Sequence, residues 1–355
     1  MNTRHTGNPL QARVRVLARA LGATLAGIAA LCLGGCSDSL ESFGGPTMGS
    51  TYTVQYVRGS GMPAPEALQS EVEKILADID QQMSTYRSDS FIERFNDGPA
   101  GCQAAPASVL KLVEYGEGLS RNSDGAFDLT VEPLLNLWGF GPKGEGLRVP
   151  SAEELEAVRA LYGYHHLQVK GAELCKDRDE IQVDFNGIAA GYAVDLIAGR
   201  LEQLGVKSYL VEATGELKAV GRKPDGSPWK IAIEAPQSET RVPQMIVALD
   251  GYAMTTAGDY RNFFEENGQR YSHTLDPSTA APVAHALAAV TVIDPSALNA
   301  DGLDTLLMVL GPERGLAYAE REHIAAFFVS HDGKGFVSRS SSAFDALVAA
   351  QQGKP

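Results

Sequence analysis

The chain has 355 residues, with 30 basic and 44 acidic side chains and a formal net charge of −14 at pH 7. This acidic balance argues against a protein that binds nucleic acid, because such a protein carries a basic face. The hydrophobic share of 44% is ample for a globular core, and the length allows one large domain or two.

The N-terminus has the features of a secretory signal. Its first 35 residues contain four arginines, no acid, and an apolar run from Ala20 to Leu33 that is shorter than the roughly 20 residues needed to span a bilayer. The run ends in Leu33-Gly34-Gly35-Cys36, which matches a lipobox, so we expect cleavage before Cys36 and acylation of its thiol, for example with palmitate. Several acyl chains hold a protein stably on a membrane. An ordinary cleaved signal followed by an incidental cysteine is the alternative.

Removal of the signal peptide, residues 1–35, would leave 320 residues with 26 basic and 44 acidic side chains, a net charge of −18. Cys32 leaves with the signal and Cys36 takes the lipid, so Cys102 and Cys175 remain. Two cysteines in a chain of this length are not a disulfide framework, and no metal-binding spacing joins them. We therefore expect no bridge between them.

Beyond the signal we expect three parts. The lipidated Cys36 and a short polar tether occupy 36–46, one catalytic unit without an internal linker occupies 47–350, and a C-terminal tail occupies 351–355.

Patterns of apolar residues predict the secondary structure in chain order. Runs of β-forming residues predict strands at 51–57, 166–169, 180–184, 208–213, 229–234, 244–250, 287–293 and 325–330. Helical spacing of apolar residues predicts helices from Pro65 to Met83, over 106–121, 151–161 and 188–204, from near Asp301, and after Pro312. Residues 133–150 are dense in Gly and Pro and are predicted to be loop. Because strands and helices mix without strict alternation, we predict an α+β fold, a mixed β-sheet with packed helices.

The most informative polar cluster lies at Asp301-Gly-Leu-Asp304-Thr305. On a helix, positions i, i+3 and i+4 share one face, so two carboxylates and a hydroxyl would converge near the helix start. Hard oxygen ligands of this kind suit Mg²⁺ or Ca²⁺ and not zinc. An aspartate N-cap with a solvated first turn is the alternative reading of the pentapeptide alone.

A second cluster runs from Asp184 to Asp195 and is predicted to lead from a strand through Asn186-Gly187 into a helix. Such a turn exposes backbone N–H groups that favour phosphate. Neither a dinucleotide fingerprint nor a P-loop occurs here, and a glycine that serves only turn geometry is the alternative.

A third candidate is His273, which lies beside a turn signalled by Asp276-Pro277. Next to a metal site this histidine would be the best general-base candidate in the chain, although a surface or hydrogen-bonded residue is the alternative. The remaining histidines outside the signal are interpreted as structural or exposed: His165, His166, His285, His323 and His331.

Together the motifs form an ordered series that resembles the FAD:protein FMN transferase (ApbE) family. The resemblance spans about residues 46–350. In chain order the motifs are Pro46–Thr51, Ser84–Ser90, Asp124–Thr130, Pro133–Pro142, Asp184–Asp195, Thr255–Arg261, His273–Pro277 and Ala300–Thr305. Each motif is weak alone, but their order is highly specific.

The resemblance implies an activity and a site. Members of the family move the FMN half of FAD onto the hydroxyl of a threonine or serine in a target protein, with Mg²⁺ bound and AMP released. Carried over by position, the FAD contacts would be Met48, Tyr86, Ala126, Phe127, Asp128, Asp184, Ala190 and Leu275. The Mg²⁺ ligands would be Asp301, Asp304, Thr305 and the backbone carbonyl of Gly187, and His273 would be the catalytic histidine.

These residues suit the chemistry of a pyrophosphate. A divalent ion neutralises its oxygens and aligns the nucleophile with the leaving group, and Mg²⁺ needs few protein ligands to do so. Because a hydroxyl has a high pKa, a base such as His273 should help the attack.

Three positions depart from the family pattern. Ala190 stands where a charged Lys or Glu is common, Thr214 replaces the first residue of a Gly-Gly-Glu motif, and Ala280 replaces a turn glycine. If position 280 requires a positive φ, Ala280 must be strained or adopt another turn.

The resemblance also implies a location and partners. We expect an enzyme anchored by its lipid on the periplasmic face of the bacterial inner membrane, acting on flavin-acceptor proteins of membrane respiratory complexes. Ser37 directly after Cys36 makes the outer membrane the alternative.

Two other functions would use the same residues. A Mg²⁺-dependent FAD pyrophosphatase would replace the acceptor hydroxyl by water and release FMN and AMP. A periplasmic flavin-binding lipoprotein would bind FAD without turnover.

Overall fold

The computed structural model describes residues 39–236, 242–259, 262–333 and 335–352, which belong to one compact unit, 37–355. The predicted signal peptide and Cys36 lie outside the described residues. Among the helices of the described part of the chain, none has the length and apolarity that crossing a membrane would require.

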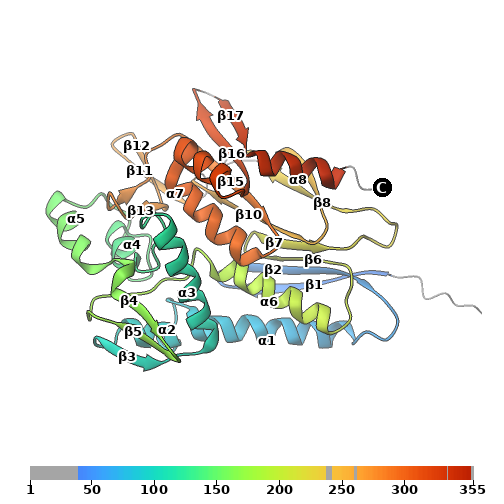
Figure 1. The fold of residues 1–355 in the computed structure, drawn as a ribbon. Helices are drawn as coiled ribbons and strands as arrows, with labels where there is room; N and C mark the ends of the chain where they lie inside the picture. The colour runs from blue at the N-terminus through green and yellow to red at the C-terminus, as the bar shows by residue number, and fades with distance from the viewer. Residues whose placement is uncertain (1–38, 237–241, 260–261, 334, 353–355) are drawn as a thin grey trace, which may run out of the picture. The chain divides into compact units, whose positions relative to one another are not determined.

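An eight-stranded sheet forms the centre of this unit (Figure 1). In spatial order its strands are β1 (Ser39–Thr47), β2 (Ser50–Arg58), β6 (Tyr209–Ala213), β7 (Glu216–Val220), β10 (Tyr252–Gly258), β15 (Leu287–Asp294), β16 (Ala325–Asp332) and β17 (Gly335–Ser340). Every neighbouring pair is antiparallel. The α+β class is confirmed, but the mixed sheet is wrong, because hairpins such as β1–β2, β6–β7 and β16–β17 join neighbouring strands directly.

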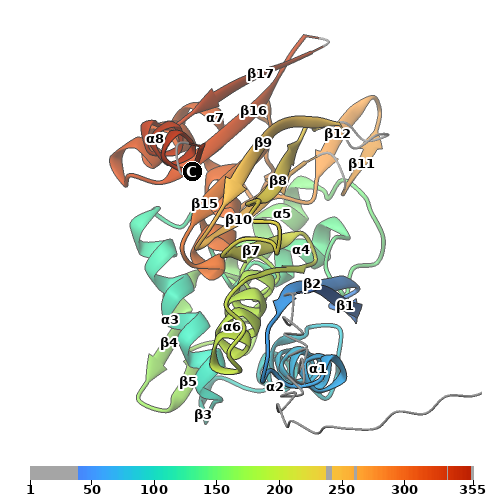
Figure 2. The ribbon, with the colours of Figure 1, turned by 90° about the vertical axis from the view of Figure 1, so that its right-hand side faces the viewer.

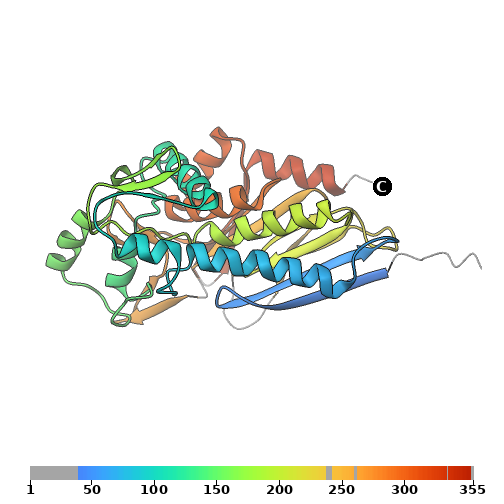
Figure 3. The same ribbon diagram turned by 90° about the horizontal axis from the view of Figure 1, so that it is seen from below.

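Helices cover one face of this sheet, and a hairpin with a further helix covers the other (Figure 2). The helices are α1 (Pro65–Met83), α2 (Phe91–Asn96), α3 (Ala107–Asn122), α4 (Glu132–Trp138), α5 (Ala152–Val158), α6 (Ala189–Gln203), α7 (Ala297–Arg321) and α8 (Ser342–Gln352). Short 3-10 turns lie at Arg159–Leu161 and Tyr164–His166. Alternate residues of β16 belong to the two cores: Phe328 lies in the core that also contains residues of α1, α6 and α7, and Phe327 stacks on Phe344 of α8. Seen from below, α1 and α6 run side by side (Figure 3).

The smaller sheets lie around this centre. Their strands are β3 (Gly101–Ala104), β4 (Leu167–Lys170), β5 (Glu173–Lys176), β8 (Trp229–Glu234), β9 (Pro243–Leu249), β11 (Phe263–Glu266), β12 (Gln269–Ser272), β13 (Leu275–Asp276) and β14 (Ala281–Pro282). Cys102 of β3 pairs with Cys175 of β5, and the two are disulfide-bonded, so the expectation of no bridge is wrong. The two cysteines are 73 residues apart, so the sequence did not indicate their pairing. The register of β3 against β5 brings them together.

The segment expected to be a polar tether is strand β1, so that interpretation is wrong from Ser39 onward. Strand β1 pairs with β2 along its whole length, and Phe43 packs edge-on against Tyr52 and Tyr56. Its polar composition is that of an edge strand with one exposed face. Met48 and Gly49 form the hairpin turn, both with positive φ, as a tight two-residue turn requires.

Most other predicted elements are confirmed within a few residues. Two predictions are wrong. Residues 180–184 form no strand, because Val183 and Asp184 donate their backbone N–H groups to Asn96 Oδ1 and to the carbonyl of Leu129. The predicted loop 133–150 begins as helix α4.

Helix α7 contains both predicted C-terminal helices and begins at Ala297 instead of near Asp301. Gly311, with φ 78° and ψ −178°, kinks it before Pro312. Because proline has no N–H, the carbonyl of Met308 loses its helical donor, and His285 Nε2 donates to that carbonyl at 2.8 Å. The interpretation of His285 as structural agrees with this contact.

Helices α6 and α7 cross at Gly191. A Cβ atom there would lie 2.3 Å from the carbonyl oxygen of Ala297 and 2.7 Å from Asp301 Cβ, which is closer than atoms can approach. The backbone N–H of Gly191 donates to Asp301 Oδ2 at 2.7 Å. The crossing therefore requires glycine, and it fixes the Asp301 carboxylate.

We predict that Gly191→Ala lowers the free energy of unfolding by about 1–3 kcal/mol, because the added methyl must push the two helices apart. Gly199 is the matched control: it lies on the same helix with nothing within 4 Å of a Cβ atom. Gly199→Ala should raise the stability by up to about 1 kcal/mol through helix propensity. Urea unfolding of both variants measures this, and a Gly191→Ala midpoint at or above wild type would contradict the close crossing.

Candidate functional site

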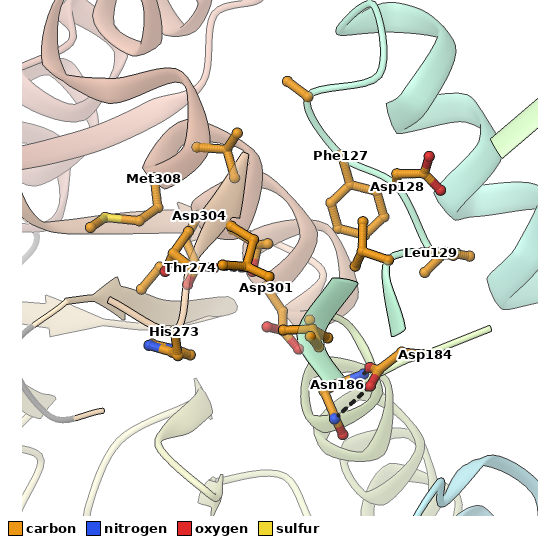
Figure 4. Close-up of a pocket in the computed structure, with 18 of the residues that line it drawn as sticks. Phe127, Asp128, Leu129, Asp184, Asn186, His273, Thr274, Asp301, Asp304 and Met308 are labelled. Carbon is orange, nitrogen blue, oxygen red and sulfur yellow. Dashed lines mark hydrogen bonds between the residues drawn. The ribbon is translucent and has the colours of Figure 1, made fainter. Parts of the chain in front are cut away.

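A cavity of about 410 Å³ opens where several segments meet at one end of the sheet (Figure 4). Its walls are the loop 126–131, the turn 184–187, the start of β7, the end of β10, the segment 273–277 and one face of α7. It brings together most of the predicted site residues: Ala126, Phe127, Asp128, Asp184, Gly187, His273, Leu275, Asp301, Asp304 and Thr305.

Asp301, Asp304 and Thr305 share the cavity face of α7, as their spacing predicted. The alternative of an aspartate N-cap with a solvated first turn is wrong. Ser296 is the N-cap, and Asp301 and Asp304 are only 5% and 2% exposed. Burial raises the pKa of both carboxyls well above the ordinary value, and the nearby charge of Glu216 raises it further.

Glu216, at the start of β7, is a cavity residue that sequence reasoning did not select. Burial raises its pKa, and Thr214 Oγ1 donates to its carboxylate at 2.6 Å. The Thr-Gly-Glu motif was visible in the sequence, but only the fold places its glutamate opposite α7. Of the described residues that line the cavity, five are carboxylates and none is Lys or Arg.

Within the described residues, no group of three or more His, Cys, Asp or Glu side chains is arranged as a metal site. A cation here would depend on Asp301 and Asp304 together with hydroxyl and carbonyl oxygens. A Cβ atom on Gly187 would lie 3.4 Å from Thr305 Oγ1, so the backbone of Gly187 passes close to that hydroxyl. The buried, mutually repelling carboxylates and the nearby neutral oxygens fit a hard divalent cation.

The turn 184–187 is held by its own aspartate. Asp184 accepts hydrogen bonds from the backbone N and the Nδ2 of Asn186 at 2.6 and 2.9 Å. Burial raises the pKa of Asp184 to about 6. The carboxylate thus shapes the cavity wall from which helix α6 starts.

Asp128 lines the cavity, but its oxygens hold the loop together. Oδ1 accepts from the backbone N and the hydroxyl of Thr130 at 2.8 and 2.7 Å, and Oδ2 accepts from the backbone N of Tyr164 at 2.8 Å. Burial raises the pKa of this carboxyl. The arrangement presents Phe127 and Ala126 to the cavity.

His273 is half-buried on the opposite wall. Its Nδ1 lies 3.1 Å from the carbonyl oxygen of Asn262, so a neutral ring donates there and leaves Nε2 free to accept a proton. Burial lowers the pKa of His273 below the ordinary value of 6.5, which favours that neutral form at pH 7. Phe140 contacts the ring edge-on.

Three predicted FAD contacts do not line the cavity. Met48 lies in the β1–β2 turn, Ala190 is buried in α6, and Tyr86 is 69% exposed in the loop after α1. Partial burial and the charges of Asp184 and Glu132 raise the pKa of Tyr86.

Two of the noted departures from the family pattern lie in left-handed backbone. Ala280 has φ 58° and Thr214 has φ 59°, a region that favours glycine. Ala280 keeps that turn, because Trp138 Nε1 donates to its carbonyl at 3.1 Å and its own N–H donates to the carbonyl of Asp276.

Comparison with known proteins shows which family the chain resembles. The family model described as the ApbE family matches residues 48–328. The chain is 43% identical over 317 residues to the FAD:protein FMN transferase of Vibrio cholerae, covering 88% of this chain and 95% of that protein. It is 39% identical over 329 residues to the protein of the same name from Haemophilus influenzae, covering 90% and 95%. The solved apo structure of Pseudomonas stutzeri flavinyl transferase ApbE is 63% identical, with a TM-score of 0.83 over 88% of this chain and 97% of that one.

A family model that matches most of the chain, together with relatives of this identity and coverage, shows that the chain belongs to the ApbE family.

Proposed function

We propose that this protein is an FAD:protein FMN transferase, which moves the FMN part of FAD onto the hydroxyl of a threonine or serine in a target protein. The observation that carries the proposal is the cavity in which the buried Asp301–Asp304 pair of α7 lies opposite His273. The names of the relatives in Vibrio cholerae and Haemophilus influenzae support the same activity.

The acidic cavity favours a divalent cation as a partner of FAD. Five carboxylates without a described Lys or Arg would repel the pyrophosphate of FAD. We propose Mg²⁺ held by Asp301, Asp304, Thr305 and the carbonyl of Gly187, and bound there it would neutralise charge on the pyrophosphate oxygens.

His273 supplies the base in this proposal. The acceptor oxygen forms a bond to the FMN phosphorus, the pyrophosphate P–O bond breaks, and AMP leaves with the bridging oxygen. Nε2 of His273 takes the hydroxyl proton, because Nδ1 faces the carbonyl of Asn262. The loop of Phe127 and the turn of Asp184 would flank the flavin.

The lipid anchor on Cys36 and a periplasmic, membrane-bound location are part of the proposal. Strand β1, as described, includes Ser39, which is three positions after Cys36 in the sequence. A short connection of this kind would hold the enzyme close to membrane-bound acceptors and raise their effective concentration. Flavin-acceptor proteins of respiratory complexes in the inner membrane are the proposed targets.

The transfer and its metal can be tested together. The 37–355 protein, incubated with FAD, Mg²⁺ and a threonine-bearing acceptor domain, should give a fluorescent acceptor band in a denaturing gel. Asp301→Asn should reduce transfer by about 100-fold or more and abolish the rise in melting temperature on adding Mg²⁺. Without Mg²⁺ this variant should be at least as stable as wild type, because burial of the charged form is costly.

Asp78→Asn on the exposed face of α1 is the matched control and should behave as wild type. AMP release without an acceptor band would favour the pyrophosphatase, and FAD binding without AMP would favour the flavin-binding lipoprotein. A Mg²⁺-induced rise in melting temperature that persists in Asp301→Asn would contradict the proposed metal site.

His273→Ala should lower kcat by about 10²–10⁴-fold and leave FAD binding intact. The base must be neutral, and burial lowers the pKa of His273 below the ordinary histidine value of 6.5. As the pH drops, wild-type kcat should therefore fall only at pH values below 6.5. This acid limb should vanish from the residual activity of the variant. His323→Asn, exposed after α7, is the control. Equal kcat values in His273→Ala and wild type would refute the role of His273 as the general base.

Cys36→Ser should abolish labelling of the protein by an alkyne analogue of palmitate in growing cells, since the thiol is the proposed acyl acceptor. Cys32→Ser, within the apolar run that precedes Cys36, is the matched control and should keep the label. A labelled Cys36→Ser protein, or an unlabelled wild type, contradicts the lipid anchor.

A further inference from the structure

Behind the cavity, helix α2 ends at Asn96, whose side chain is only 3% exposed. Nδ2 of Asn96 donates to the carbonyl of Val183 at 3.0 Å and to Glu132 Oε2 at 3.1 Å. Its Oδ1 accepts from the backbone N of Val183 at 2.8 Å. One buried amide therefore binds two segments that are far apart in the sequence.

Those two segments continue directly into cavity walls. Val183 precedes Asp184 and the turn 184–187, and Glu132 follows the loop 126–131. The walls also meet through the backbone, where the N–H of Asp184 donates to the carbonyl of Leu129 at 2.8 Å. Asn96 itself is not among the described residues that line the cavity.

A buried lysine fixes Asn96 from the other side. Lys176 is 3% exposed, and its Nζ donates to the carbonyls of Asn96, Asp179 and Ile181 at 2.9, 2.9 and 3.0 Å. Because a buried ammonium without such partners is costly, this set of bonds resists displacement of the end of α2.

Glu132 is fully buried and accepts hydrogen bonds from Asn96 and, at 3.4 Å, from Asn136 Nδ2. Burial, reinforced by the carboxylates of Asp184 and Glu93 and opposed by Lys143, raises the pKa of Glu132 to about 8. The hydroxyl of Tyr86 also interacts with the Glu132 carboxyl. At pH 7 the Glu132 carboxyl is therefore neutral, and at higher pH it would add a charge beside Asp184.

We propose that Asn96 and Glu132 are positioning residues: they set the spacing between the 126–131 and 184–187 walls and thereby the fit of the cavity to FAD. The inference rests on the proposed use of FAD and extends it to two residues that do not line the cavity. Wall spacing should affect binding of the flavin substrate more than the chemical step at His273.

Asn96→Ala should raise KM for FAD by about 10- to 100-fold, because small displacements of positioning groups have effects of this size. Its kcat should change far less. Asn122→Ala is the matched control, because Asn122 is the exposed last residue of α3 as Asn96 is the buried last residue of α2. A KM equal to that of the control, in a variant that melts at a lower temperature, would show a structural role alone and overturn the proposal.

Glu132→Gln keeps the shape of the side chain and should fold even if Asn96→Ala does not. Wild-type KM for FAD should rise as the pH passes about 8, where Glu132 ionises beside Asp184. The variant should lose that rise, and a persistent rise would overturn the role of Glu132. The acceptor-band assay and a direct titration of FAD by fluorescence together separate the two hypotheses. A wild type that binds FAD without transfer refutes the proposed function, whereas wild-type transfer with unaltered FAD binding in the variants refutes only the positioning role.

Discussion

Helices α6 and α7 cross where Gly191 has no side chain, and the site is built around this crossing. The missing Cβ lets the carbonyl of Ala297 and the side chain of Asp301 lie against the backbone of α6. The Gly191 N–H then holds the Asp301 carboxylate at 2.7 Å. Since α6 starts directly after the 184–187 turn, the same crossing places that turn beside the acidic face of α7. Any separation of the helices would move both walls.

The site concentrates negative charge where water is largely excluded. Asp301, Asp304 and Glu216 each have a raised pKa because burial disfavours the charged form, and their proximity adds repulsion. Such a cluster is unfavourable for the folded protein unless a cation or a proton relieves it. An anionic pyrophosphate meets the same obstacle, so binding of a divalent cation and of FAD would assist each other.

Stability and site geometry are linked at two turns. Ala280 and Thr214 occupy left-handed backbone that glycine would adopt more easily, at a cost on the order of 1–2 kcal/mol each. Hydrogen bonds from Trp138 to the carbonyl of Ala280 and from Thr214 to Glu216 hold the turns. The two turns flank the His273 segment and the start of β7, so the strain is located at the walls of the cavity.

Much of the fold and of the site could be predicted from the periodicity of apolar residues and from the order of the motifs. The helices at α1, α3 and α6, most strands of the sheet, the α+β class and the Asp301–Asp304–Thr305 face follow from local spacing, because the helical repeat places i, i+3 and i+4 together whatever surrounds them. The ordered motifs also indicated the family. Tertiary structure alone decided the features that depend on partners distant in sequence. Strand β1 forms because it pairs with β2. Residues 180–184 form no strand because Asn96 and Leu129 accept hydrogen bonds from their backbone. Cys102 lies beside Cys175 because of the register of β3 and β5. The burial of Glu216 at the cavity and the hydrogen bonds of Asn96 to two distant segments arise in the same way, because both depend on neighbours that no local pattern specifies.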